Sequence, residues 1–162
     1  GIQPFIGYNY AAKNYKRMNG AIKFSTACSV IFGTVTTLVF FFAAEPLVGM
    51  FIKNSEIIEM GSLFFKIFII PIPILGIQFI FMNTFQAIGK AIPALVLSIC
   101  RQGLAFIPAL IIGKRFFGLD GVIWAQPVAD LITIAISIVL YITVYGMIKR
   151  EVSIKEELLA AS

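Results

Sequence analysis

Four long stretches of this sequence are apolar and nearly free of charge, and they constrain the fold more than any other feature. A helix that crosses a membrane needs about 20 mainly apolar residues, and the stretches at 24–44, 62–86, 91–112 and 121–146 are long enough. Hydrophobic residues make up 59% of the chain and charged residues only 13%, whereas a water-soluble domain is about 45–50% apolar and about 25% charged. The sequence therefore predicts an all-α integral membrane protein with four transmembrane helices and excludes an ordinary soluble domain.

The chain divides into an opening segment, a membrane bundle and a tail. Residues 24–148 hold the four apolar stretches as one bundle, because the connections are too short for an inserted domain. We expect residues 1–23 to be the cytoplasmic end of a preceding helix plus a basic loop, and residues 149–162 to be a cytoplasmic tail. The opening places its lysines after an apolar piece, in the reverse order of a secretory signal. We therefore expect the chain to be a fragment of a longer protein.

The basic residues predict the orientation of the bundle. Alternate connections lie on the same side of a membrane, and cytoplasmic connections carry the excess of Lys and Arg. One side has three cations, which are Lys53, Lys114 and Arg115. The other side has eight, which are Lys13, Lys16, Arg17, Lys23, Lys90, Lys149, Arg150 and Lys155. We therefore expect both ends of the chain in the cytoplasm. Four spans agree with this, because an even number returns the chain to the side on which it started.

The composition also excludes several kinds of chemistry. The sequence has no histidine, so it has neither a His-based zinc site nor a Ser-His-Asp triad. Its two cysteines, Cys28 and Cys100, lie in apolar stretches, where thiols are usually small packing residues. The net charge of +5 is spread over the connections and forms no single stripe, so nucleic acid is not an expected partner. We expect no enzymatic activity and no cofactor, and metal binding stays open.

A charged pair is predicted within the membrane. Arg101 lies about ten residues into the third stretch, which at about 1.5 Å per residue is about 15 Å deep, near the midplane. Asp130 lies at a similar depth in the antiparallel fourth stretch. An arginine there costs about 2.5–3.5 kcal/mol and must face protein or water. A structural ion pair is one interpretation, and direct participation in substrate or cation coupling is the other.

Amide side chains extend the set of candidate cleft residues. Gln78, Gln102 and Asn83 lie within the spans, where a wet cleft would use them to hold a substrate. The alternative is that they join helices to one another, because amides in lipid prefer interhelical partners worth about 0.6 kcal/mol each.

Three prolines are candidate hinges. Pro71, Pro73 and Pro108 each remove a helical hydrogen-bond donor and clash with the preceding turn, which produces a kink or a break. Broken helices often line the substrate path of transporters. Kinks are also routine packing features of membrane helices, so the moving hinge and the static kink remain open.

Several motifs, in order, carry a resemblance to a known family. They are GIQPFIGYNYAAKNYKR at 1–17, FQAIGKA at 85–91, SICRQGLAFIP at 98–108 and FGLDGVIWAQPVAD at 117–130. The chain resembles the carboxyl-terminal half of a MATE (multidrug and toxic compound extrusion) transporter, in particular of the bacterial MepA-like group. The resemblance covers essentially the whole chain. One departure is Ala11-Ala12, where the family typically has Gly-Ala.

The resemblance implies both a fold and a function. The four spans would be helices nine to twelve of a twelve-helix transporter and part of its carboxyl-terminal six-helix lobe. The whole protein would be a multidrug efflux antiporter that exports small organic, often cationic, compounds in exchange for H⁺ or Na⁺ by alternating access. Its partners would be the missing amino-terminal lobe and membrane lipids, and its location a bacterial or archaeal cell membrane, which it crosses several times.

Two alternatives remain beside this function. A related lipid-linked oligosaccharide flippase has a similar plan, but it should present several cleft cations for a pyrophosphate, and only Arg101 lies deep. A non-transporting helical subunit would use its polar groups only at helix-helix contacts. A membrane enzyme is disfavoured, because histidine is absent and Asp130 is the single deep carboxylate.

Overall fold

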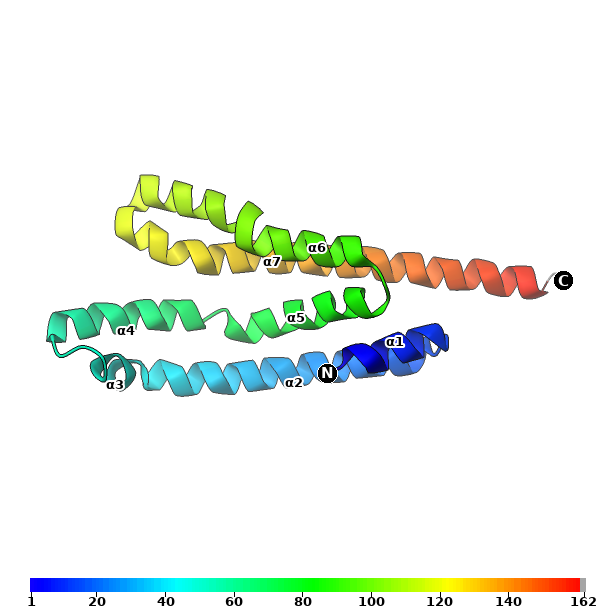
Figure 1. Cartoon of the computed structure of the whole chain (residues 1–162), viewed down its shortest axis with the longest axis horizontal. Coiled ribbons are helices and arrows are strands. Elements are labelled where there is room, and N and C mark those ends of the chain that lie inside the picture. The colour runs from blue at the N-terminus through cyan, green and yellow to red at the C-terminus, as the bar shows by residue number, and fades with distance from the viewer. Residues whose placement is uncertain (161–162) are drawn as a thin grey trace.

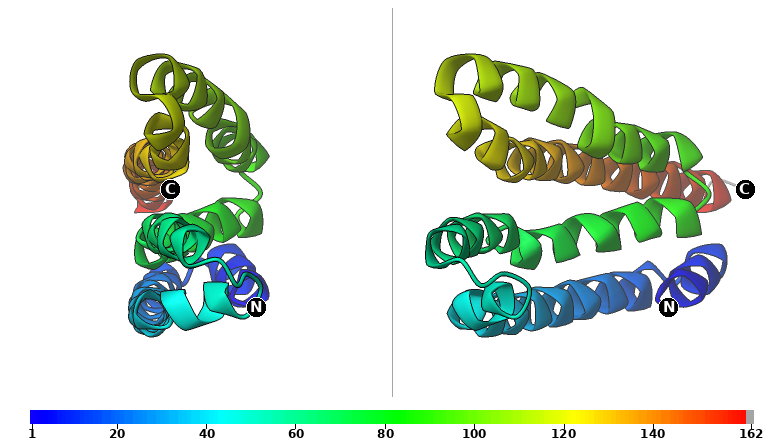
Figure 2. Two further views of the ribbon diagram at one scale, coloured as in Figure 1. Left: turned by 90° about the vertical axis from the view of Figure 1, so that its left-hand side faces the viewer. Right: turned by 60° about the vertical axis from the view of Figure 1, so that its left-hand side comes forward.

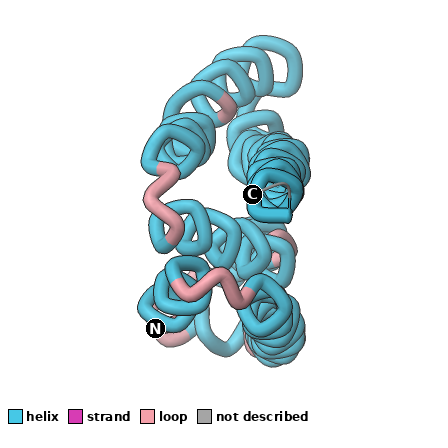
Figure 3. The backbone as a smooth tube through the Cα atoms, turned by 90° about the vertical axis from the view of Figure 1, so that its right-hand side faces the viewer, coloured by secondary structure: helices cyan, strands magenta, loops and turns pink. Residues whose placement is uncertain are grey.

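Helices make up all of the regular secondary structure in the described part of the chain (Figures 1 and 3). The structure, a computed structural model, describes the backbone of residues 1–160 and the side chains of residues 1–148 except Gln102. The elements in chain order are α1 (Gln3–Ala11), α2 (Tyr15–Phe42), α3 (Ala44–Gly49), α4 (Ser55–Ile69), α5 (Ile72–Ala87), α6 (Ala91–Ile99), the π-helix η1 (Cys100–Leu104) and α7 (Phe106–Ala160).

The segment α4–α5 is the central layer of the bundle. End-on, it lies between α2 on one side and the pair of α6 and α7 on the other (Figure 2). It contacts all three, and in the described part of the chain its contact with α2, made through α5, is the most extensive between two helices. Polar residues on α5 are therefore placed to meet residues of α6, η1 and α7.

Sharp backbone corners end α1 and α5. After α5, Gly89 has φ +73°, its N–H donates to the carbonyl oxygen of Gln86 at 3.1 Å, and the N–H of Lys90 donates to that of Phe85 at 2.9 Å. These two bonds form a Schellman motif, which needs a left-handed residue. Lys13, with φ +56°, occupies the same position after α1. Both corners lie at the end of the bundle from which the terminal part of α7 extends (Figure 1).

Prolines divide the second apolar stretch, as the sequence predicts. Pro71 lies between α4 and α5. The break occurs beside a close contact with α2, since an added Cβ on Gly33 would lie 2.8 Å from the Cα of Pro73. One helical turn further along α5, an added Cβ on Gly76 would lie 2.8 Å from the Cβ of Ser29. Two glycines on opposite helices therefore allow α2 and α5 to approach closely.

The third and fourth stretches differ in detail from the expectation. We expected the third span to stop at Gly113, but the helix continues to Gly118. There φ is +61° and ψ is −128°, a conformation that only glycine adopts without strain. The chain turns back at this point (Figure 1), and the backbones of Gly113 and Gly121 touch so closely that neither position has room for a Cβ atom. The turn within α7 therefore depends on Gly113, Gly118 and Gly121.

Three helical segments in the described residues are long and apolar enough to cross a membrane, namely Tyr15–Phe42, Ser55–Ala87 and Phe106–Ile148. The expected span 91–112 does not appear as one such helix, because η1 divides it. The first span begins nearer the amino terminus than the expected residue 24, since Asn14 caps α2 by accepting a hydrogen bond from the backbone N–H of Arg17 at 3.2 Å. The lysines and arginine of residues 15–23 therefore lie on a helix instead of in a loop.

One cluster of buried side chains forms the main core, and much of the surface of the bundle is apolar. The main core cluster joins five helices and consists of Ile6, Met18, Ile22, Phe85, Ile88, Ala94, Leu97, Val144 and Ile148. Along α2, by contrast, large side chains such as Phe32 and Phe42 are 75% and 80% exposed. A surface of this kind is suited to contact with lipid.

Candidate functional site

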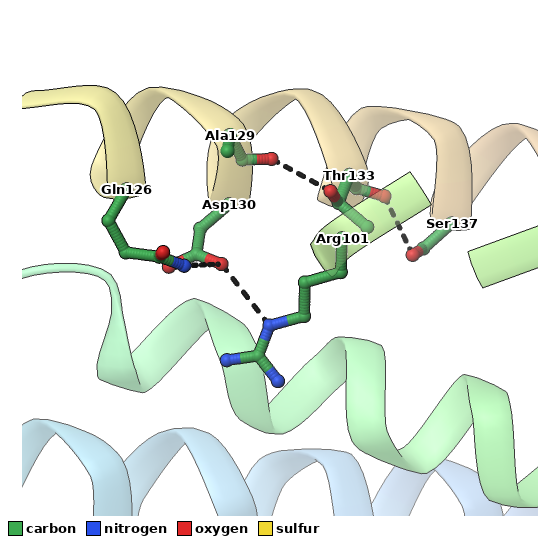
Figure 4. Close-up of polar contacts among 6 residues, drawn as sticks. All are labelled: Arg101, Gln126, Ala129, Asp130, Thr133 and Ser137. Atoms are coloured by element: carbon green, nitrogen blue, oxygen red, sulfur yellow. Dashed lines mark hydrogen bonds and ion pairs between the residues drawn. The ribbon is translucent and has the colours of Figure 1, made fainter. Parts of the chain in front are cut away.

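Arg101 and Asp130 form a salt bridge inside the helix bundle. The Nε atom of Arg101 lies 3.3 Å from Oδ1 of Asp130, and the two side chains reach toward each other from η1 and α7 (Figure 4). The Asp130 side chain is 4% exposed and that of Arg101 is 26% exposed. A carboxylate taken out of water needs a charged partner, and Arg101 supplies it. The structure thus contains the pair that matched depth on antiparallel segments predicts.

A short π-helix carries Arg101. In η1 the backbone N–H of Ala105 donates to the carbonyl oxygen of Cys100, five residues earlier, at 2.8 Å. A hydrogen bond over five residues defines a π-helix. Pro108 follows in the first turn of α7 and has no N–H to give to the carbonyl of Leu104. The irregular turn therefore carries Arg101, the cation of the pair, and π-helices are often found at functional sites.

Gln126 is a third member of the polar cluster, although its position in the sequence places it nearer a membrane interface than the candidate cleft residues. Its Nε2 atom donates to Oδ1 of Asp130 at 3.2 Å, so this single carboxylate oxygen accepts from two side chains (Figure 4). Residues four apart are neighbours on a helix, and this spacing between Gln126 and Asp130 is the signal that identifies the contact.

Two small hydroxyl residues continue the polar face of α7 beyond Asp130. Thr133 and Ser137 are fully buried, and each donates to a carbonyl oxygen one turn earlier, at 2.7 and 2.8 Å. Their hydroxyls are therefore satisfied by their own helix (Figure 4). Because the side chains are small, they allow neighbouring helices to approach this face closely.

Residues of α5 form the opposite wall of the site. The guanidinium carbon of Arg101 lies 5.3 Å from the centre of the Phe79 ring, within the range of a cation–π interaction. Gln78 is only 4% exposed, and among the described residues its Oε1 atom has no hydrogen-bond partner. Together with Met82 and Ser98, these residues line a cavity of about 200 Å³.

The other residues predicted for the site lie elsewhere or turn away. The Nδ2 atom of Asn83 donates to the carbonyl oxygen of Phe79 at 2.6 Å, so this amide makes its hydrogen bond within its own helix. The side chain of Gln102 lies outside the described residues. Pro71 and Pro73 stand at an observed break between helices, while their role as moving hinges, like that of Pro108, stays a prediction.

The site offers one cation, one carboxylate and amide groups for binding polar partners. Within the residues whose positions are described, no three His, Cys, Asp or Glu side chains lie close enough together to hold a metal ion. The fold and the charged pair thus define the class, a helical membrane protein with a polar site enclosed between its apolar helices.

Comparison with known proteins identifies the family. The MatE family model matches residues 1–111. The Multidrug export protein MepA of Staphylococcus aureus is 32% identical over 143 residues, which are 88% of this chain and 31% of MepA. MepA of Staphylococcus saprophyticus is 29% identical over the same length. The chain belongs to the MATE family of multidrug efflux transporters, and it spans about a third of the length of these relatives.

Solved structures show the same fold. The MATE multidrug transporter DinF-BH, solved in a complex, superimposes with a TM-score of 0.80 at 32% identity, over 86% of this chain and 31% of that chain. The Vibrio cholerae MATE transporter VcmN in the bent form superimposes with a TM-score of 0.81 at 23% identity, over 91% and 34% of the two chains. The helical arrangement of this chain is therefore that of part of a MATE transporter.

Proposed function

We propose that this chain is part of a secondary active multidrug efflux antiporter, which exports small organic, often cationic, compounds in exchange for H⁺ or Na⁺ by alternating access. The observation that carries the proposal is the Arg101–Asp130 pair beside the polar cavity. A buried ion pair in an apolar bundle is a poor source of stability, and intramembrane charges commonly mark substrate or ion pathways. A site of this kind fits transport better than helix packing alone.

The proposed topology has four membrane crossings. The kink at Gly118 separates α7 into two antiparallel parts (Figure 1), so α2, α4–α5, the segment from α6 to Gly118 and the rest of α7 each cross once. Both ends of the chain then lie in the cytoplasm, where the basic residues near α1 and those after residue 148 in the sequence would be close to anionic lipid. The remaining helices of the transporter, including its amino-terminal lobe, would complete the cleft between two lobes.

Dye efflux tests the proposal. Cells that make the full-length transporter carrying this chain are loaded with ethidium, and efflux is compared between the wild type and Arg101→Ala, with the amount of protein in the membrane measured for each. We expect Arg101→Ala to lose efflux at a normal membrane level. Lys66→Ala is the matched control, because Lys66 is also a cation within a predicted span but pairs with Glu45, outside this site.

Two other outcomes have definite meanings. Unchanged efflux by Arg101→Ala would make the ion pair a structural contact and remove it from the transport mechanism. A wild-type protein that is present in the membrane but moves no ethidium would count against a drug pump and favour the flippase.

A further inference from the structure

Two complementary polar groups line one cavity without a hydrogen bond between them. The cavity, of about 200 Å³, is lined by Gln78, Phe79 and Met82 of α5 and by Ser98 and Arg101 of the α6–η1 segment. Gln78 is 4% exposed, and its Oε1 atom, a hydrogen-bond acceptor, has no partner among the described residues. A buried acceptor without a partner costs free energy, so an arrangement in which Oε1 accepts a hydrogen bond is more favourable for this residue.

Arg101 supplies the complementary donors. A guanidinium has five N–H donors, and the hydrogen bond to Asp130 uses the one on Nε. The two terminal nitrogen atoms point away from Asp130 and toward α5 (Figure 4). There the guanidinium carbon lies 5.3 Å from the centre of the ring of Phe79, the residue that follows Gln78. The guanidinium is therefore already in contact with the helix that carries the unpaired acceptor.

The contact between Arg101 and Asp130 is a loose one. It joins one nitrogen to one oxygen at 3.3 Å, whereas strong charge-assisted bonds of this type are about 2.7–2.9 Å long and arginine often makes two in parallel. The same oxygen accepts from Gln126 at 3.2 Å, and this second bond would remain if Arg101 left. The cavity is several times larger than the volume of about 30 Å³ that a water molecule occupies in the liquid, so the guanidinium has room to turn.

We propose that Gln78 is the second partner of Arg101, which moves its guanidinium from Asp130 to the Oε1 atom of Gln78 when the carboxylate loses its charge. A charged guanidinium in an apolar bundle needs an acceptor, and neutralisation of Asp130, by a proton for example, weakens the acceptor that it has. Gln78 lines the same cavity, and its amide oxygen is unpaired in the described part of the chain. Gln78 is thus a positioning residue, which acts through Arg101.

The other ionisable groups of the helices packed around Asp130 lie elsewhere. Helices α5 and α6 contain none, and Cys100 of η1 lines a separate apolar cavity. On α7 the next ionisable residue after Asp130 is Tyr141. Those of α4 line a third cavity together with one residue of α7, and they are Glu56, Glu59 and Lys66 with Asp120. Loss of the charge on Asp130 therefore leaves Arg101 without an ionised partner among the described residues, and Gln78 is the acceptor within its cavity.

This inference deepens the proposed function and rests on it for the place of the exchange in a transport cycle. The exchange moves a contact of Arg101 from α7 to α5, so the charge of one carboxylate determines which spans are bonded to each other. A local change of charge that shifts a contact between two alternatives is the usual form of a molecular switch. An antiporter requires a link of this kind between an ion and the packing of its helices.

Unfolding of the purified full-length transporter carrying this chain tests the exchange without transport. Gln78→Leu is measured in the wild-type background and in Asp130→Asn, which keeps the shape of the carboxylate without its charge. In the wild type, Gln78→Leu should leave the unfolding equilibrium constant unchanged or lower it, because it removes an unpaired buried amide. In Asp130→Asn it should raise this constant about tenfold or more, because it removes a hydrogen bond to a charged group.

Gln86→Leu is the matched control, since it makes the same change two turns further along α5, where the side chain is exposed and bonds to Gln3. Its effect on the unfolding equilibrium constant should be the same in both backgrounds. An effect of Gln78→Leu that is also the same in both backgrounds would overturn the exchange.

Gln78→Glu provides a rescue that a role in packing alone does not predict. In Asp130→Asn it gives Arg101 a carboxylate at the second position, so the double variant should have an unfolding equilibrium constant about tenfold lower than that of Asp130→Asn. Gln86→Glu should give no such recovery. If Asp130→Asn does not fold, recovery of folded protein by Gln78→Glu and not by Gln86→Glu supports the exchange, and recovery by neither variant overturns it.

Ethidium efflux by the wild type, measured beside these experiments, decides the proposed function separately. Absence of efflux together with a background-dependent effect of Gln78→Leu would overturn the proposed function and support the exchange. Normal efflux together with equal effects in the two backgrounds would overturn the exchange and leave the proposed function in place.

Discussion

The Nε atom of Arg101 contacts Asp130 across 3.3 Å, and the carboxylate is almost fully buried while the guanidinium is partly accessible. The pair is therefore asymmetric. Part of the Arg101 guanidinium is accessible, whereas Asp130 is enclosed and depends on Arg101 and on the amide of Gln126. This asymmetry governs what each substitution should do.

Replacing Asp130 by Asn should lower the free energy of unfolding while the protein still folds. Removing one partner of a buried pair costs about 3–5 kcal/mol, and we expect about 3 kcal/mol here, at the lower end of that range, because Arg101 is partly accessible. The free energy of unfolding in detergent, measured with a denaturant, checks this value. The double variant Arg101→Gln/Asp130→Asn should cost less than the sum of the two single variants, because it leaves no unpaired charge. Strict additivity would show that the two side chains do not interact.

The second ion pair of the bundle should behave differently. Lys66 Nζ lies 3.7 Å from Oε1 of Glu45, but the Glu45 side chain is 69% exposed. Exposed pairs contribute about 0–1 kcal/mol, so Glu45→Gln should change the free energy of unfolding by less than about 1 kcal/mol in the same denaturant titration. A loss of unfolding free energy as large as that of Asp130→Asn would mean that the Glu45 side chain is buried in the folded protein and not exposed as in this structure.

Hydropathy and charge predicted the helical membrane class and the contact between Arg101 and Asp130. Arg101 and Asp130 were identified because an isolated charge in an apolar stretch is conspicuous, and because a short turn between antiparallel segments fixes their relative depth. The break at Pro71 was predicted for a similar reason, since proline acts on the backbone wherever it stands.

Other features depend on contacts that a linear pattern does not contain. A turn was expected at residues 118–121, and the structure has it at Gly118; the continuation of the third span past Gly113 was not expected, because it depends on which of the three glycines adopts a positive φ. The π-helix at Arg101 depends on the register of backbone hydrogen bonds, and a hydropathy pattern contains no information on that register. The Oε1 atom of Gln78, which has no hydrogen-bond partner in the described part of the chain, can be recognised only once the helices are packed together.

Gly33 should be intolerant of even a methyl group. An added Cβ would lie 2.8 Å from the Cα of Pro73, and backbone atoms cannot move aside as a flexible side chain can. Overpacking costs about 1–3 kcal/mol, so Gly33→Ala should lower the melting temperature of the purified protein. Gly20→Ala, on the same helix, has no atom within 4 Å of the added Cβ and should leave stability unchanged or slightly higher. Equal melting temperatures for the two variants would show that α2 and α5 are not in contact at Gly33.

Gly118 should be essential for the reversal that brings the two parts of α7 together. At φ +61° and ψ −128°, alanine would be strained by about 1–3 kcal/mol, although an added Cβ would meet no other atom. Gly118→Ala should therefore lower the melting temperature, and the cause would be the backbone conformation alone. Gly146→Ala is the control, because the same methyl group also meets nothing there but sits on a regular helix, where alanine is favoured over glycine by about 0.5–1 kcal/mol. The two variants should shift the melting temperature in opposite directions, and a Gly118→Ala protein as stable as Gly146→Ala would mean that the chain does not turn at this glycine.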